Sequence, residues 1–172
     1  MTWITSIWEI MWEVLGFFQV FTVLEPYEGG VVTRMGKYKR TIGPGVTWHL
    51  PLGIDEITKE NVATEVAEMG TQSLTTADGE TIQLAAVVTY HIFDCKRYLL
   101  DVEDAGDALT DAASGYITDQ VASSTWSEIL DPDFSTSLKK HIQATARKWG
   151  IGVTNLQFSD LVKCPTIRLL TE

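Results

Sequence analysis

The sequence has few cysteines, few histidines and a deficit of basic residues. The two cysteines, Cys95 and Cys164, share no metal-binding spacing and are too few for a disulfide framework, which favours free thiols in a reducing compartment. The histidines, His49, His91 and His141, lie far apart and show no paired metal-ligand spacing, so we expect no metal site. The 13 Lys and Arg against 23 Asp and Glu give a net charge of −10, which argues against nucleic-acid binding.

The sequence also lacks the short motifs of common enzyme classes. It contains no Gly-x-Ser-x-Gly elbow and no phosphate loop, and its glycines between residues 29 and 45 precede a strand-like run rather than a helix. The carboxylates between residues 101 and 133 contain no Asp-x-Asp-x-Asp-Gly loop of the kind that binds calcium. We therefore expect no catalytic residue and no cofactor.

The first 24 residues, by contrast, are rich in apolar and aromatic side chains and contain no Lys or Arg. A helix over residues 3–24 would be about 33 Å long, enough to cross a bilayer core of about 30 Å. Pro26 would end it, and the missing basic start disfavours a cleavable signal peptide. We predict a membrane anchor over residues 1–24, with the membrane-facing candidates Trp3, Ile7, Trp8, Met11, Trp12, Leu15, Phe17, Phe18, Phe21 and Leu24.

A polar stripe interrupts the apolar character of this segment. At about 100° per residue, one side of a helix would carry Thr2, Ser6, Glu9, Glu13 and Gly16. A charged side chain at the centre of a bilayer costs roughly 2.5–3.5 kcal/mol. The stripe could pack against a neighbouring helix in an oligomer, or the first half could lie in the headgroup layer as a monotopic anchor. We favour the packed stripe because it is narrow, and the monotopic arrangement stays open.

Charge is distributed unevenly over the rest of the chain. Residues 34–40 contain four basic side chains and no acidic one, whereas residues 101–133 contain nine carboxylates and no Lys or Arg. A basic cluster soon after an apolar segment favours a main domain on the cytoplasmic side of a membrane, and it could contact anionic headgroups or be a solvated strand face. Opposite charges on neighbouring copies could pair, and the candidates for such an oligomer interface are Arg34, Lys37, Arg40, Asp107, Asp111, Lys139, Lys140 and Arg147.

The pattern after residue 25 begins with strands. Glycine and alternation predict strands over residues 30–38, 46–50 and 55–62, with a turn over residues 40–45. A long hairpin is predicted over residues 63–94, because Asp78-Gly79 separates two strand-like runs and glycine accepts the positive φ of a primed turn. The second arm is apolar on one face and partly apolar on the other, which predicts a central strand covered on both sides.

Helical periodicity replaces alternation from Asp104 onward. Apolar residues recur at three and four positions up to residue 121, with aspartates on the outer side. Asp131-Pro132-Asp133 predicts the start of a second helix, which Gly150 ends, and residues 151–161 form a closing strand. Strands followed by helices predict an α+β fold.

Four separated stretches of the sequence together resemble one known family. They are GVVTRMGKYKRTIGPGVTWHLPLGID at residues 30–55, LTTADGETIQLAAVVTYHIFD at residues 74–94, the acidic helix, and WGIGVTNLQFSDL at residues 149–161. In order and spacing these stretches resemble the SPFH or band 7 superfamily of stomatin, prohibitin and flotillin, and most of all its stomatin-like branch. The resemblance implies an SPFH domain over residues 25–172, with an antiparallel-rich twisted sheet, a long β-hairpin, two amphipathic helices and a closing strand.

The resemblance implies a scaffold rather than an enzyme. Members of this superfamily sit on membranes, assemble into large rings or cages, and influence membrane proteases, channels and lipid organisation. They usually continue into a heptad-rich coiled coil, and no heptad run follows the closing strand here. The resemblance therefore does not by itself imply a tall closed cage, and a short ring or association with a longer SPFH relative stays open.

The sequence thus favours a membrane-anchored, oligomeric scaffold that contacts lipid and organises a membrane patch or modulates a membrane protease or channel. Two alternatives stay open. One is a monomeric membrane-bound adaptor that recruits one partner through its acidic helix. The other is an enzyme or transport component whose site is not visible in the sequence.

Overall fold

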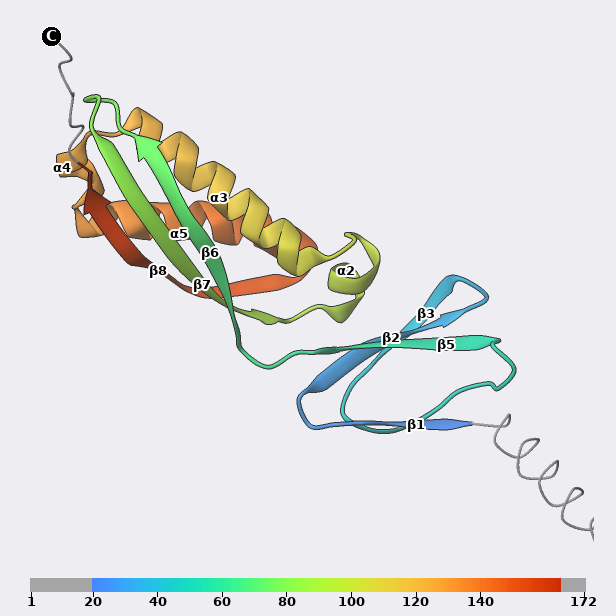
Figure 1. The fold of residues 1–172 in the computed structure, drawn as a ribbon. Helices are drawn as coiled ribbons and strands as arrows, with labels where there is room; N and C mark the ends of the chain where they lie inside the picture. Colours follow the sequence, from blue (N-terminus) through green and yellow to red (C-terminus); the bar gives the residue numbers. More distant parts are fainter. Residues whose placement is uncertain (1–19, 165–172) are drawn as a thin grey trace, which may run out of the picture. The chain divides into compact units, whose positions relative to one another are not determined.

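The computed structural model describes residues 20–164, which divide into two compact units between Ala63 and Thr64 (Figure 1). All strand pairs in both units are antiparallel, and the helices follow the strands of the second unit, so the α+β class is confirmed. The first unit contains the strands β1 (Phe21–Leu24), β2 (Glu28–Arg34), β3 (Lys37–Ile42), β4 (Gly45–Trp48) and β5 (Asp55–Asn61). The second contains β6 (Glu65–Thr75), β7 (Thr81–Ile92), α2 (Cys95–Leu100), α3 (Ala105–Ser123), α4 (Trp126–Ile129), α5 (Pro132–Ala146), the 3₁₀ turn η1 (Arg147–Trp149) and β8 (Ile151–Lys163).

Strand β1 corrects the prediction for the N-terminal segment. Phe21 and Leu24, which we expected in an anchor helix, belong to β1, and this strand pairs with β4. The four residues Phe-Thr-Val-Leu alternate in exposure, and Leu24 is buried with Val32 and Ile42 in the small core of the first unit. Backbone pairing and this burial therefore outweigh the apolar run that suggested a continuous helix.

The other anchor candidates and the polar stripe, all before residue 20, lie outside the described residues. Across residues 20–164, the helices are too short or too polar for any of them to span a bilayer.

The strand predicted over residues 30–38 is instead the start of a hairpin. Met35 and Gly36 both have positive φ, 49° and 77°, as a two-residue primed turn between β2 and β3 requires. Strand β3 continues to Ile42, so only residues 43–44 of the predicted turn over residues 40–45 lie outside strands. The sheet of this unit has the order β3-β2-β5, with β1 and β4 forming a separate ribbon.

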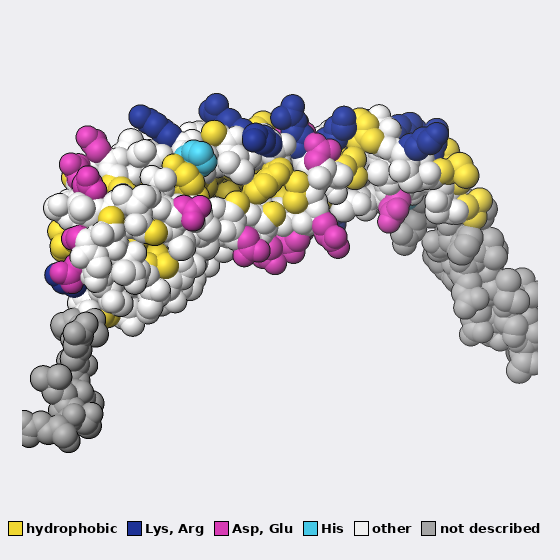
Figure 2. Space-filling model, turned by 90° about the horizontal axis from the view of Figure 1, so that it is seen from above, with side chains coloured by type: hydrophobic (Ala, Val, Ile, Leu, Met, Phe, Trp, Pro, Cys, Tyr) yellow, Lys and Arg dark blue, Asp and Glu magenta, His cyan; other side chains and the backbone are white. Residues whose placement is uncertain are grey.

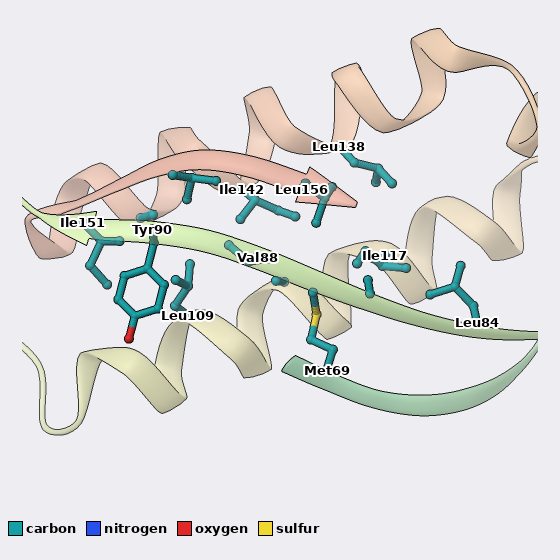
Figure 3. Packing of buried hydrophobic residues seen from close by; sticks show 14 of the residues in the cluster. Met69, Leu84, Val88, Tyr90, Leu109, Ile117, Leu138, Ile142, Ile151 and Leu156 are labelled. Carbon is teal, nitrogen blue, oxygen red and sulfur yellow. The ribbon is translucent and has the colours of Figure 1, made fainter. Parts of the chain in front are cut away.

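The second unit is a sheet of order β6-β7-β8 with α3 and α5 packed on one face (Figure 3). The predicted hairpin of β6 and β7 is confirmed, and Figure 3 shows the β7 residues Leu84, Val88 and Tyr90 on the helical side. The opposite face of β7 is only partly shielded, with Gln83 and His91 exposed. The prediction of a strand covered on both sides is therefore wrong within the described residues, since both long helices pack on one side.

Both predicted amphipathic helices are present in the second unit. Helix α3 begins after the N-cap Asp104 and buries one residue per turn, namely Ala105, Leu109, Ala113, Ile117 and Val121. Helix α5 begins with Pro132 after Asp131, whose side chain accepts a hydrogen bond from the Asp133 N–H. Gly150 then adopts φ of 78° after η1 and leads into β8. The short helices α2 and α4 were not predicted, because six and four residues are too few to establish a period.

Candidate interaction surfaces

A shallow groove lies between α3 and α5 in the second unit. Its volume is about 230 Å³. Tyr116 of α3 and His141 of α5 stack across it with ring centroids 3.8 Å apart and planes only 4° from parallel. Apolar and small side chains form most of the remaining lining, which comprises Leu109, Ala112, Ala113, Asp119, Ile142 and Thr145. The groove therefore combines an apolar floor with an aromatic stack and one carboxylate.

The two helices that form this groove carry opposite charge. Asp107 and Asp111 are exposed on α3, while Lys140 and Arg147 are exposed on α5 and at its end. Lys139 is half-buried on α5. Figure 2 shows hydrophobic side chains and a histidine between acidic side chains on one side and basic ones on the other. Within residues 20–164 no ion pair joins the acidic side chains of α3 to the basic ones of α5, so both sets are available to a partner.

The basic cluster of residues 34–40 lies in the first unit, where some of its members hold the structure together. Arg34 donates to both carboxylate oxygens of Asp55, at 2.6 and 3.0 Å, and Lys39 approaches the same carboxylate at 3.9 Å. Arg40 donates to the carbonyl of Trp48 at 2.6 Å. Lys37 is exposed beside the hairpin turn. Of the interface candidates in this unit, Lys37 is therefore the one best placed to meet a partner.

The buried carboxylate of Asp55 interacts with Arg34, Lys39 and one backbone N–H group of the first unit. Its side chain is 2% exposed and also accepts a hydrogen bond from the Leu50 N–H at 2.9 Å. The Arg34 hydrogen bonds, followed by the one from Leu50, hold the pKa of the Asp55 carboxyl well below its usual range. This carboxylate therefore links β2 and β5 to the loop that follows β4.

An apolar face of the β1–β4 ribbon is exposed in the first unit. Phe21 lies opposite Trp48 and Val23 lies opposite Val46, so the four side chains share one face. Each of the four is more than half exposed, and the rings of Phe21 and Trp48 meet edge to face with centroids 6.0 Å apart. We call these four residues the apolar ribbon. The sequence prediction missed this surface because it placed residues 21–24 in a helix, although the alternation of residues 46–50 was recognised.

The histidines and acidic groups of the described part form no metal-binding cluster. His49 lies 3.2 Å from the Thr22 hydroxyl, and His91 lies 3.4 Å from the Thr154 hydroxyl. Among residues 20–164, no group of three or more His, Cys, Asp or Glu side chains could hold a metal ion.

Comparison with known protein families gives a match over most of the chain. The model of the SPFH domain / Band 7 family matches residues 22–168. This span includes all the strands and helices of both units except the first residue of β1. The match therefore covers nearly all of the described residues and does not include the apolar residues 1–21.

Several relatives share this region. HflK of Vibrio cholerae is 34% identical over 114 residues, which cover 66% of this chain and 29% of that protein. The modulator of FtsH protease HflK of Escherichia coli K12 is 29% identical over 152 residues, which cover 86% of this chain and 35% of that protein. An uncharacterized protein of Methanocaldococcus jannaschii is 23% identical, and the match covers 87% of this chain and 79% of that protein. This chain thus spans about a third of the HflK proteins, and it belongs to the SPFH domain / Band 7 family.

Proposed function

We propose that this protein is a membrane-anchored, oligomeric scaffold that modulates a membrane protein, with a membrane protease as the first candidate partner. Family membership supports the scaffold role, and the E. coli relative is itself named a modulator of the FtsH protease. Because this chain spans only 35% of that relative, the protease partner is carried over as part of the proposal. The proposal gives this chain no catalytic step.

Membrane attachment is supported by two neighbouring parts of the chain. Residues 3–19 are mostly apolar in sequence, and they run through Val20 directly into β1. The apolar ribbon begins at that point and exposes two aromatic and two branched aliphatic side chains. Aromatic side chains favour the boundary between water and lipid, so the ribbon can lie against the same bilayer that receives the N-terminal segment.

The hairpin of β2 and β3 adds a basic contact for the membrane surface. Met35 at its turn is 83% exposed, and Lys37 follows two residues later. A methionine beside an exposed lysine suits anionic headgroups, because apolar contact and charge attraction then act together. In this arrangement the main domain lies on the cytoplasmic side, as the position of the basic cluster in the sequence favours.

Assembly is supported by the charges that flank the groove of the second unit, and this is the observation that carries the proposal. The carboxylates of Asp107 and Asp111 and the basic groups of Lys140 and Arg147 have no ion-pair partners among the described residues. Opposite charges on different helices of one chain allow a head-to-tail contact, in which the acidic helix of one copy meets the basic helix of the next. Such contacts repeat and can close a ring.

Membrane fractionation tests the attachment on which this function depends. The full chain should stay in the membrane pellet after an alkaline carbonate wash. Deletion of residues 1–19 is the appropriate comparison, since deletion to residue 24 would remove β1 and uncover the core around Leu24. The deletion variant should be released by carbonate. A full chain found in the soluble fraction without detergent would contradict the proposal.

A further inference from the structure

A second hollow in the second unit lies where the end of β7, the start of β8, helix α2 and the end of α5 meet. Its volume is about 500 Å³. None of its lining residues is acidic, and two of them are arginines. The lining consists of His91, Phe93, Arg97, Gln143, Arg147, Gly152 and Val153.

Two glycines fix the backbone at this hollow: Gly152 lines it, and Gly150 lies two residues earlier. Gly150 accepts backbone hydrogen bonds from Phe93 and Asp94 at 3.0 and 3.2 Å, which fixes the entry to α2 against the end of η1. A Cβ on Gly150 would lie 2.4 Å from the Asp94 carbonyl oxygen. Gly152 pairs with His91, and a Cβ there would lie 2.6 Å from Cε1 of the imidazole. The His91 ring therefore lies over Gly152, where any larger residue would displace it.

The two arginines of the hollow differ in their partners. Arg97 Nε lies 3.2 Å from the Asp94 carboxylate, and about half of the Arg97 side chain is exposed. The same carboxylate also caps α2 by accepting from the backbone N–H groups of Lys96 and Arg97. Arg147 is exposed and makes no ion pair with any residue between 20 and 164. One guanidinium is thus held in place at the wall, and the other is free to close on a ligand.

The chemistry of the lining points to a phosphate group. Guanidinium groups bind phosphate through paired hydrogen bonds, and a phosphate monoester supplies about −1.5 to −2 charges and three acceptor oxygens. Gln143 and His91 offer further N–H donors from two other elements. The Phe93 ring, 55% exposed, offers an apolar surface beside them. We propose that this hollow binds a phosphate monoester whose organic group packs against Phe93.

Calorimetric titration of the full chain in zwitterionic nanodiscs tests this site, with phenyl phosphate and inorganic phosphate as probes. Both should bind, phenyl phosphate more tightly. The double variant Arg97→Gln/Arg147→Gln should lower the affinity for both probes at least about tenfold, since it removes two charge-assisted contacts. The matched control Lys148→Gln/Lys163→Gln removes the same charge from exposed positions outside the hollow and should change the affinity less than about twofold.

Two further variants keep the test decisive if the arginine variant does not fold. Phe93→Ala should weaken phenyl phosphate and leave inorganic phosphate unchanged. Gln143→Glu should weaken both by placing a negative charge in the lining. No binding by the wild type, or an equal loss of affinity in the lysine control, would overturn the site and leave only general charge attraction.

Nanodiscs that contain phosphatidic acid, whose headgroup is a phosphate monoester, separate two sources of the ligand. If the hollow receives a lipid headgroup, these nanodiscs should compete with phenyl phosphate for the wild type and not for the arginine variant. If it receives a free phosphate ester, phenyl phosphate affinity should not change. Either result supports the site, and neither depends on whether the protein forms the proposed scaffold.

Discussion

At the scale of single residues, one buried carboxylate connects the strands of the first unit, and one glycine allows a close backbone approach in the second. Asp55 connects two strands and a loop through Arg34 and the Leu50 N–H. Gly150 occupies a left-handed conformation next to the Asp94 carbonyl. The sequence predicted Gly150 as the end of a helix from its position, whereas Asp55 appeared only as the first residue of a strand. A salt bridge between β2 and β5 cannot be recognised without the register that brings its partners together.

Asp55→Asn should lower the thermal stability of the first unit at neutral pH, because it removes the charge that Arg34 and Lys39 face. The folded-state pKa of Asp55 lies below its unfolded value of about 3.9, so its stabilisation is complete above that pH and is lost as the pH falls through the folded-state pKa. Melting curves between pH 7 and pH 2 should show a shallower acid decline for the variant. Glu56→Gln, at an exposed position on the same strand, should keep the wild-type decline.

Gly150→Ala should destabilise the second unit by at least about 1–2 kcal/mol, the cost of a left-handed alanine, because the new Cβ also meets the Asp94 oxygen. Gly115→Ala is the matched control, since Gly115 lies within α3 and a Cβ there meets nothing within 4 Å. That control should stabilise the unit by up to about 1 kcal/mol through helix propensity. Denaturant unfolding followed by circular dichroism measures both, and equal stabilities would refute the role given to Gly150.

At the scale of elements, periodicity predicted the long segments and failed for the short ones. Helices α3 and α5 and the hairpin of β6 and β7 were predictable because each repeats its pattern over many residues. Strand β1 was not, since four residues joined to an apolar run give no separate signal. The groove depended on the two helices lying side by side, so its Tyr116–His141 stack could not be read from either helix alone.

The apolar ribbon should contact lipid when the full chain is bound to vesicles. An environment-sensitive dye attached through Trp48→Cys, in a Cys164→Ser background, should emit at shorter wavelength and be quenched by spin-labelled lipid. The same dye attached through Ser73→Cys, at an exposed position on the sheet of the second unit, should show neither effect. Equal quenching at both positions would show that the apolar ribbon is not a specific membrane contact.

At the scale of the whole molecule, the net charge of −10 opposes association of copies unless basic side chains of one copy pair with acidic side chains of the next. The exposed charges of α3 and α5 supply both signs within one unit. Attraction of this kind is screened over about 10 Å at 0.1 M salt and over about 3 Å at 1 M. Assembly through these helices should therefore weaken as salt is raised.

Asp107→Lys/Asp111→Lys should reduce particle size while leaving the fold intact, because both side chains are exposed on α3. The change costs at most about 1 kcal/mol at the helix start. Glu68→Lys/Asp160→Lys changes the net charge equally at exposed positions of the sheet and should leave the particle unchanged. Mixing the α3 variant with Lys139→Asp/Lys140→Asp should restore larger particles. Light scattering that shows the wild-type size for the α3 variant would exclude this helix from the interface.

The mass of the membrane-extracted particle shows whether the chain is an oligomeric scaffold in a membrane, as we propose. The full chain, extracted with its surrounding lipid by a polymer that forms native nanodiscs, can be weighed by mass photometry. We expect a particle that contains many copies of the 19.1 kDa chain. A particle that contains a single copy would contradict the scaffold and favour a monomeric adaptor.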